Sequence, residues 1–440
     1  MTLRFGTDGV RGVANSDLTP ELVVALGRAA ARTLGADRFV IGRDTRRSGP
    51  LLEAALVAGL TAEGVQVATL GVVPTPTVAW TSAATGVAGA MISASHNPFS
   101  DNGIKLFAPG GRKLRDDTEE QLEAELDALV HGVVSEDVPT GAVVGTLQAE
   151  PEHLLGYASS VVASIDGRDL RGVHVVIDCA NGSATTIAPH VLRELGAQVD
   201  VLHATPDGTN INDHCGSTHP ADLQRMVVER GAQAGLAFDG DADRVLAVDE
   251  RGDLVDGDQI IAICALDRHK RHALVGDAVV VTVMANLGFR NAMAEHGIRI
   301  VETAVGDRSV LDALEANGLS LGGEQSGHVI FHDLATTGDG LLTGVQLLDV
   351  MVRTGRPLAE LAGAMTRLPQ VLQNVQVSGD ASDRVAAIES AIAAASAELG
   401  GGGRVLVRPS GTEPIVRVMV EAPTHDQAER IAHELASALS

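Results

Sequence analysis

The sequence predicts an α/β protein with three similar α/β domains and a smaller C-terminal α+β domain. Three segments resemble one another, beginning at Ala62, Glu194 and Glu295. Each reads as a helix end, a glycine, a β-branched strand and a loop. A short, continuous apolar run precedes each helix, as expected for parallel strands covered on both faces. The alternative to three repeated units is that the pattern carries no such information, because any α/β protein places glycine between helix and strand.

The C-terminal part of the chain follows a different order of elements. "VLQNVQVSG" predicts a strand, "SDRVAAIESAIAAASAEL" a helix, and "RVLVRPSGTEPIVRVMVEA" two strands around a turn. A last helix begins with a capping box formed by Thr424 and Gln427. Candidate boundaries near Glu150, Asp253–Asp256 and Leu368 divide the chain into residues 1–150, 151–255, 256–369 and 370–440.

Composition limits the partners that the protein can have. The formal net charge of −24 argues against nucleic acid, whose phosphates the surface would repel. A small phosphorylated ligand remains compatible, provided that cations cluster locally. Three scattered cysteines suggest neither a zinc site nor a disulfide framework, so we expect a reducing cytoplasm. With no apolar signal region and no run of about 18 apolar residues, we expect no membrane association.

The stretch "SASHNPFSDNGIK" places polar residues directly after an apolar strand. In parallel α/β sheets ligands meet the carboxyl ends of strands, which exposes Ser93 or Ser95. Asn97 and Pro98 then force a turn. A hydroxyl presented in this way can act as a nucleophile or carry a phosphoryl group. The alternative is that these side chains only satisfy turn amides.

The stretch "LAFDGDADRVLAVDE" alternates three aspartates between two apolar strands. Three carboxylates this close repel one another unless a cation lies between them, and hard oxygen ligands favour Mg²⁺ or Ca²⁺. An EF-hand is disfavoured because Arg244 stands where its loop needs glycine and because the flanks read as strands, not helices. A solvated acidic loop is the alternative.

Two further loops carry groups suited to sugars and phosphates. "GGEQSGHVIF" offers Glu324 and Ser326 to hydroxyls, and His328 could carry a proton. "RPSGTEPIVRV" contains two arginines, two hydroxyls and a glycine amide, which suits an anion. Ordinary turns are the alternative for both. The N-terminal "FGTDGVRG", with Thr7, Asp8 and Arg11, is a weak signal alone.

Taken together, these loops resemble the α-D-phosphohexomutase superfamily from end to end. The motifs are "GTDGVRG", "SASHNPFSDNGIK", "DGDADR", "GEQSGH" and "RPSGTEP", in the family's order. "GTDGVRG" and Gln325 favour its glucosamine branch. The resemblance implies four domains with mixed, mainly parallel sheets in the first three, arranged around a central cleft.

The resemblance also implies roles for individual residues. Ser95 would be a phosphoserine, and one Mg²⁺ per chain would be held by an oxygen of that group with Asp239, Asp241 and Asp243. Lys105, the best candidate for proton transfer, would act with His96, Arg11 and His328, while Arg244 would bind substrate. Glu324 and Ser326 would hold sugar hydroxyls. The non-reacting phosphate would be held by Arg408, Ser410, Gly411, Thr412 and Arg417.

The implied activity is an isomerase reaction on a small phosphosugar, between glucosamine 6-phosphate and glucosamine 1-phosphate through a 1,6-bisphosphate. Phosphorylation or a sugar 1,6-bisphosphate would prime Ser95. The product would feed UDP-N-acetylglucosamine and peptidoglycan precursor synthesis. The alternatives are a phosphomannose or phosphoglucose mutase, a serine-dependent metal phosphatase, or a non-catalytic sugar-phosphate sensor. The sequence leaves a homodimer open.

Overall fold

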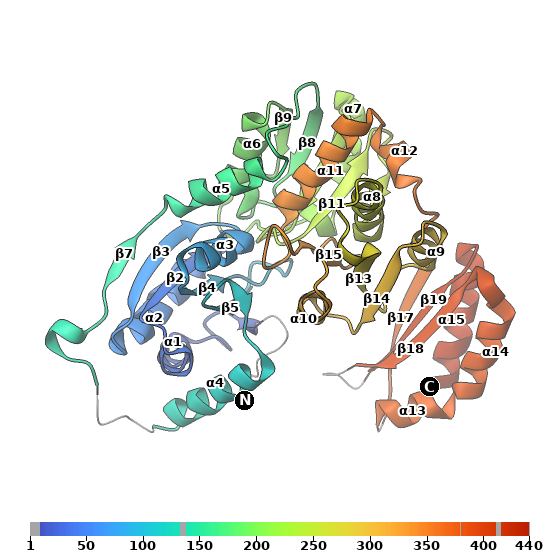
Figure 1. Ribbon diagram of the computed structural model, residues 1–440. Helices are drawn as coiled ribbons and strands as arrows, with labels where there is room; N and C mark the ends of the chain where they lie inside the picture. Colours follow the sequence, from blue (N-terminus) through green and yellow to red (C-terminus); the bar gives the residue numbers. More distant parts are fainter. Residues whose placement is uncertain (1–8, 133–137, 379, 411–414, 440) are drawn as a thin grey trace. The chain divides into compact units, whose positions relative to one another are not determined.

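The computed structural model describes residues 9–132, 138–378, 380–410 and 415–439. The chain divides into two compact units (Figure 1). One comprises Met1–Val283 with Arg299–Ala362, and the other Met284–Ile298 with Gly363–Ser440. Within the described residues the first unit holds three sheets and the second holds one. None of the described helices has both the length and the apolar character that a membrane crossing requires.

The first sheet has a parallel centre and an antiparallel edge. Its order is β1-β5-β4-β2-β3-β7, with β6 paired to β5. Phe39 and Ile41 of β2 face a core built with α1, α2 and α4, whereas Val40 faces a core built with α3. The strands are β1 (Val10–Val13), β2 (Arg38–Arg43), β3 (Gln66–Val72), β4 (Ala88–Ile92), β5 (Asp101–Ala108), β6 (Arg112–Lys113) and β7 (Leu147–Ala149). The helices are α1 (Pro20–Leu34), α2 (Gly49–Ala62), α3 (Thr75–Thr85) and α4 (Asp116–Val130).

The second sheet repeats this plan in the order β12-β11-β10-β8-β9. Its centre is parallel, because β8 pairs in parallel with both β9 and β10, and β11 turns antiparallel at the edge. The strands are β8 (His174–Asp178), β9 (Gln198–Leu202), β10 (Ala234–Phe238), β11 (Val245–Asp249) and β12 (Leu254–Val255). The accompanying helices are α5 (His153–Ala163), α6 (Ala184–Glu194) and α7 (Ala221–Arg230).

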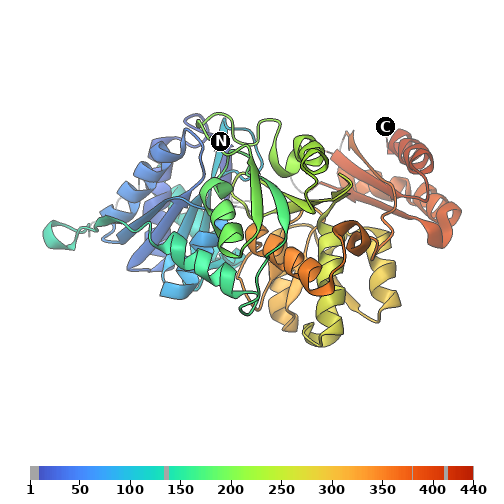
Figure 2. The ribbon, with the colours of Figure 1, turned by 90° about the horizontal axis from the view of Figure 1, so that it is seen from above.

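The third sheet has the order β14-β13-β15-β16, parallel except for β16. Its strands are β13 (Ala278–Thr282), β14 (Arg299–Thr303), β15 (Leu321–Gly323) and β16 (Val329–Phe331), and its helices are α8 (Gly257–Lys270), α10 (Asp307–Asn317), α11 (Gly340–Thr354) and α12 (Leu358–Ala362). Helix α11 is buried from Gly340 to Met351 and lies beside α5 and α6 (Figures 1 and 2). Because α11 is buried on nearly all sides, its polar residues also need partners, and Asp349 pairs with Arg168.

The second unit is an antiparallel sheet, β17-β19-β18, with four helices. The strands are β17 (Gln370–Gln376), β18 (Arg404–Pro409) and β19 (Ile415–Glu421), and the helices are α9 (Leu287–Glu295), α13 (Ala381–Ala387), α14 (Glu389–Leu399) and α15 (His425–Leu439). The single helix predicted after β17 is two helices. The break falls at Ile388, whose side chain is buried in the core of this unit.

The predicted fold class is confirmed by these sheets. Three sheets with parallel centres are followed by a smaller antiparallel sheet with helices. Val280 and Val281 in β13 are fully buried, as a continuous apolar strand covered on both faces should be. The antiparallel strands make the three sheets mixed, and β5, β11 and β16, which join each parallel centre, all follow a polar loop of the candidate site.

Candidate active site

The serine loop begins where β4 ends, at the edge of the first sheet. Ser95 is buried and has a left-handed backbone with φ of 53°. Its N–H donates to Ser93 Oγ at 2.9 Å, and its own hydroxyl donates to Asp239 Oδ2 at 2.5 Å. The predicted serine therefore lies directly against the predicted metal loop, which comes from the second sheet.

Arg46 fixes the backbone of this loop. It is the largest side chain with almost no exposure, and its Nε donates to Asp44 Oδ2 at 2.8 Å. Its guanidinium also donates to four loop carbonyls, those of Ser95, Asn97, Pro98 and Asp101. Because both residues of this pair are buried, the charge of Arg46 is balanced and its remaining donors orient the loop.

Arg46 and Asp44 are site residues that the sequence analysis missed. They follow β2, which is parallel to β4, so both strands end at the same edge of the sheet. The run "RDTRRSGP" after an apolar strand was the available signal. It was overlooked because a polar run after a strand is also what an ordinary loop contains.

Asn212 supports the serine loop from the second sheet. Its Nδ2 donates to the carbonyl of Ser95 at 2.8 Å and to that of Asn97 at 3.1 Å. The N–H of Asn212 donates to the carbonyl of Ala180 at 2.9 Å. The position of Asn212 therefore depends on the loops after β8 and β9.

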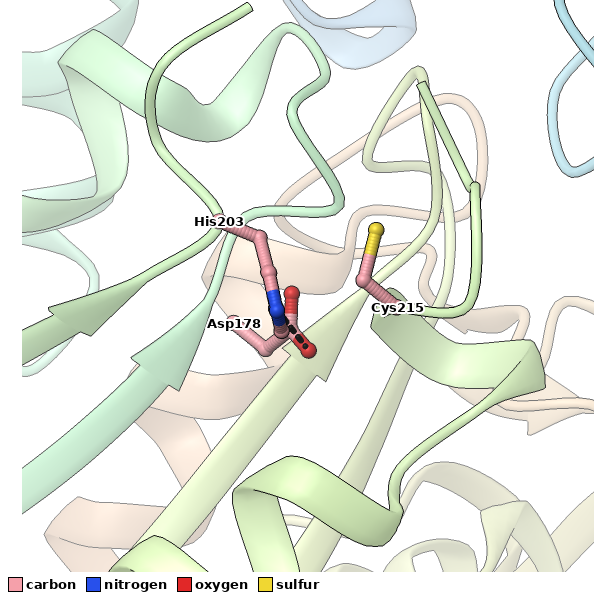
Figure 3. A group of neighbouring side chains, drawn as sticks. All are labelled: Asp178, His203 and Cys215. Carbon is pink, nitrogen blue, oxygen red and sulfur yellow. Dashed lines mark ion pairs between the residues drawn. The ribbon is translucent and has the colours of Figure 1, made fainter. Parts of the chain in front are cut away.

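Those loops are anchored by Asp178, which lies beside His203 and Cys215 (Figure 3). The Asp178 carboxylate accepts the N–H groups of Ala180 and Gly216, each at 2.9 Å. It also pairs with His203 Nδ1 at 2.9 Å. Asp178, His203 and Cys215 could together hold a metal, since their ligand atoms lie within 4.8 Å of one another. However, both oxygens of Asp178 are already engaged, and burial raises the pKa of the Cys215 thiol to about 12. We therefore interpret the group as an anchor for the loops.

The aspartate loop connects β10 with β11. Asp239, Asp241 and Asp243 are buried, and their ligand atoms lie within 4.8 Å of one another. Lys105, on β5, donates to Asp241 Oδ2 at 2.8 Å and to Asp243 Oδ2 at 3.0 Å. Thr75 Oγ1 donates to Asp241 Oδ2 at 2.7 Å. Three buried carboxylates are thus gathered around one point.

The charges at this point fit a metal ion. The Oδ1 atoms of Asp241 and Asp243 are buried and accept no hydrogen bond from the described residues. Burial, together with Asp243 and Asp241, raises the pKa of Asp239 well above its usual range. Burial also opposes the charge of Asp243, but Lys105 and His328 outweigh it and hold the pKa of Asp243 well below its usual range. A cation bound by the two open oxygens would relieve the repulsion that raises the pKa of Asp239.

Positive charge surrounds the outer side of the serine loop. His96 Nδ1 lies 3.3 Å from Ser95 Oγ. Burial, and after it the positive charges of Arg244 and Arg11, lower the pKa of His96 to about 4. His96 is therefore neutral at neutral pH, and the field of the two arginines is suited to a phosphate.

The predicted sugar loop is the turn between β15 and β16. Glu324 is half-buried and accepts the N–H of Gly306 at 3.1 Å, whereas Ser326 is exposed. His328 is buried, with Nδ1 3.8 Å from Asp243 Oδ2, and its Nε2 accepts the N–H of Gly338. The buried His328 imidazole therefore lies next to Asp243 of the aspartate loop.

The predicted phosphate loop lies in the second unit. Arg408 on β18 and Arg417 on β19 are cross-strand partners, and Ser410 donates its N–H to the carbonyl of Ile415. Arg417 Nε is buried and makes no hydrogen bond to any residue that the structure describes. Two like charges directly opposite each other are unfavourable, and a bound anion would compensate them. The predicted residues Gly411 and Thr412, like Thr7 and Asp8, lie outside the described residues.

The fold and these sites define a class of protein, and comparison with known families agrees with them. The models of phosphoglucomutase/phosphomannomutase alpha/beta/alpha domains I, II and III match residues 2–131, 155–252 and 256–368. The model of the C-terminal domain of that family matches residues 372–438. The chain therefore belongs to the phosphoglucomutase/phosphomannomutase family.

The names of individual relatives are more specific than the name of the family. Phosphoglucosamine mutase from Moorella thermoacetica is 54% identical over 433 residues, covering 97% of both chains. Its counterpart from Salinispora arenicola is 54% identical over 440 residues, covering 98% of this chain and 97% of the relative. A phosphoglucomutase/phosphomannomutase family protein from Burkholderia thailandensis has a similar structure, with a TM-score of 0.82, 27% identity, and 100% and 97% of the two chains covered. An Aspergillus fumigatus N-acetylphosphoglucosamine mutase, solved with GlcNAc-6P and magnesium, has the same fold, with a TM-score of 0.71, 20% identity, and 100% and 96% covered.

The pairing of His203 with Asp178 predicts a pH-dependent contribution to stability. The hydrogen bond to Asp178 raises the pKa of His203, so this contribution is complete below the unfolded pKa of about 6.5 and is lost as pH rises through the folded value. We expect His203→Gln to lower the melting temperature more at pH 6 than at pH 9. The exposed His214, changed to Gln, is the control and should show no such difference. An equal loss for His203→Gln at both pH values would contradict the anchoring role.

The open oxygens of the aspartate loop predict a divalent-ion site. We expect Asp241→Asn to weaken Mg²⁺ or Mn²⁺ binding by about 10- to 100-fold or more, because it removes a charged ligand. Isothermal titration calorimetry would measure this. Asp253→Asn, which changes an exposed carboxylate of the same sheet region, should leave the affinity unchanged. Equal binding by both variants would place the ion elsewhere.

Proposed function

We propose that the chain interconverts glucosamine 6-phosphate and glucosamine 1-phosphate, with a phosphoserine at Ser95 as the group that is exchanged. The observation that carries the proposal is the 2.5 Å hydrogen bond from Ser95 Oγ to Asp239, within a triad of buried carboxylates. The amino sugar is supported by relatives that are 54% identical over nearly the whole chain and are phosphoglucosamine mutases.

The metal in this proposal is Mg²⁺, held by Asp239, Asp241, Asp243 and an oxygen of the phosphoserine. Carboxylate oxygens at one open site are the ligands that Mg²⁺ prefers. When bound, the ion neutralises charge that develops on the transferred phosphoryl group. The magnesium in the Aspergillus fumigatus structure is consistent with this choice.

The reaction exchanges two phosphate esters. The P–O bond to Ser95 Oγ breaks while a P–O bond forms to the free sugar hydroxyl, which loses its proton, and Ser95 Oγ gains one. The resulting 1,6-bisphosphate turns around, and its other phosphoryl group returns to Ser95 by the reverse transfer. Lys105 is our candidate for proton transfer, and Arg11, His96 and Arg244 would hold the phosphoryl oxygens.

Chain-specific features support the remaining roles. His328 is buried against Asp243, so we propose that it positions the aspartate loop. Glu324 and Ser326 would bind sugar hydroxyls. Arg408 and Arg417, with Ser410, Gly411 and Thr412, would hold the phosphate that does not react. We propose the four-domain division 1–150, 151–255, 256–369 and 370–440, one loop to each domain.

A metal-dependent phosphatase is the main rival. It would use the same serine and carboxylates but transfer the phosphoryl group to water. The paired Arg408 and Arg417 favour a mutase, because a phosphatase does not need to retain its product. Release of inorganic phosphate in step with the loss of substrate would support the phosphatase. A sensor without catalysis would tolerate the loss of Ser95.

The phosphoryl carrier is tested by Ser95→Ala. We expect turnover of glucosamine 6-phosphate to fall by about 1,000-fold or more, because the group exchanged with the sugar has no attachment point. Ser100→Ala, an exposed serine of the same loop, is the control and should retain activity. Intact mass after treatment with glucose 1,6-bisphosphate should show one added phosphoryl group in the Ser100→Ala protein and none in Ser95→Ala. Undiminished turnover by Ser95→Ala would refute the mechanism.

The choice of sugar is tested by a panel of hexose phosphates. We expect at least about 10-fold higher kcat/KM for glucosamine 6-phosphate than for glucose or mannose 6-phosphate, a difference of about 1.4 kcal/mol in the transition state. A coupled assay for each 1-phosphate would measure it. Equal rates would overturn the assignment to glucosamine and leave the phosphoserine mechanism standing.

A further inference from the structure

A cavity of about 100 Å³ lies in the first unit, apart from the groups used above. Its walls come from α3, α5, residues 334–337 and the start of α11. It is lined by Trp80 and Tyr157, the only tryptophan and the only tyrosine in a chain with 2% aromatic residues. A cavity of this order of size can take one benzene-sized ring.

Asp339 lies in the wall of this cavity with 3% of its surface exposed. Its Oδ1 accepts the N–H of Leu342 at 2.9 Å, as the N-cap of α11. The Tyr157 hydroxyl lies 2.9 Å from Oδ1 and 3.0 Å from Oδ2. Among the described residues no lysine, arginine or histidine nitrogen lies within 4.0 Å of this carboxylate.

Among the described residues, the charge of Asp339 is therefore stabilised by hydrogen-bond dipoles without a cationic side chain. Burial raises the pKa of Asp339 to about 6, despite the helix N-terminus and the Tyr157 hydroxyl. A buried carboxylate normally has a cationic partner, because desolvation without one is costly. Asp339 instead lines a cavity, which could hold a cation in place of a cationic side chain.

The other groups in the wall suit an organic cation. Trp80 and Tyr157 supply aromatic rings, which attract ammonium groups and pack against apolar carbon. Ser160, Ser164 and Thr337 add hydroxyls that can accept hydrogen bonds from N–H groups. We propose that this cavity is a binding site for a small organic ammonium ion, with its charge at Asp339 and its apolar part against Trp80.

The cavity wall contains no residue of the serine loop. Two segments of the wall, however, lie next to residues that donate hydrogen bonds to the aspartate loop. Pro76 in the wall follows Thr75, which donates to Asp241. Asp339 precedes Gly340, whose N–H donates to the carbonyl of Ala242 at 3.0 Å. None of the lining residues belongs to the phosphosugar site proposed above, so the inference does not depend on that function.

The test uses the full-length protein and the fluorescence of Trp80, which needs no label because no other tryptophan is present. Benzylammonium is the probe, and benzyl alcohol is its neutral counterpart of similar shape. We expect a saturable change in emission with benzylammonium at concentrations at least about 10-fold lower than with benzyl alcohol, which corresponds to about 1.4 kcal/mol.

Three variants separate the charge from the cavity. Asp339→Asn keeps an N-capping side chain and should abolish the preference for benzylammonium over benzyl alcohol. Asp333→Asn removes a half-exposed carboxylate next to the wall and should keep that preference. Ala83→Phe, at an exposed position on α3 that lines the cavity, should block both ligands. No saturable change in the wild type, or an unchanged preference in a folded Asp339→Asn protein, would overturn the proposal.

Discussion

Three carboxylates are buried where the first two sheets meet, and this concentration of negative charge governs the architecture around it. Without nearby cations, repulsion among the buried carboxylates would make their burial unfavourable. These carboxylates belong to Asp239, Asp241 and Asp243. Lys105 reaches them from β5, and within the described part of the chain two carboxylate oxygens accept no hydrogen bond. The fold thus supplies part of the compensating charge and leaves room for a metal ion to supply the rest.

The serine loop depends on the same junction. Ser95 takes a left-handed backbone that a serine seldom adopts, so the surroundings must hold it there. Arg46 does so from the first sheet through the loop carbonyls, and Asn212 does so from the second. The Ser95 hydroxyl lies within hydrogen-bond distance of Asp239, so a shift of either support would move the serine loop away from the aspartate loop.

Three buried carboxylates of the chain differ in the partners that stabilise their charge. Asp44 is neutralised within its own loop by Arg46, and Asp243 by Lys105 together with His328. Asp339 is left with hydrogen bonds from a helix end and a tyrosine. Asp44 and Asp243 thus each have a cationic side-chain partner, whereas among the described residues Asp339 has none.

Local patterns in the sequence were sufficient for the fold class and for the cluster of three aspartates. Apolar strands such as "AVVVT" and the aspartates of "DGDADR" report their environment directly, because burial and ligand type depend on the residues themselves. The tertiary structure alone decided which distant groups meet. Ser95 and Asp239 are 144 positions apart, and Lys105 and Asp241 are 136 apart. Arg46, Asn212 and Thr75 gain their roles only through sheet order and loop contacts, which no short sequence window contains.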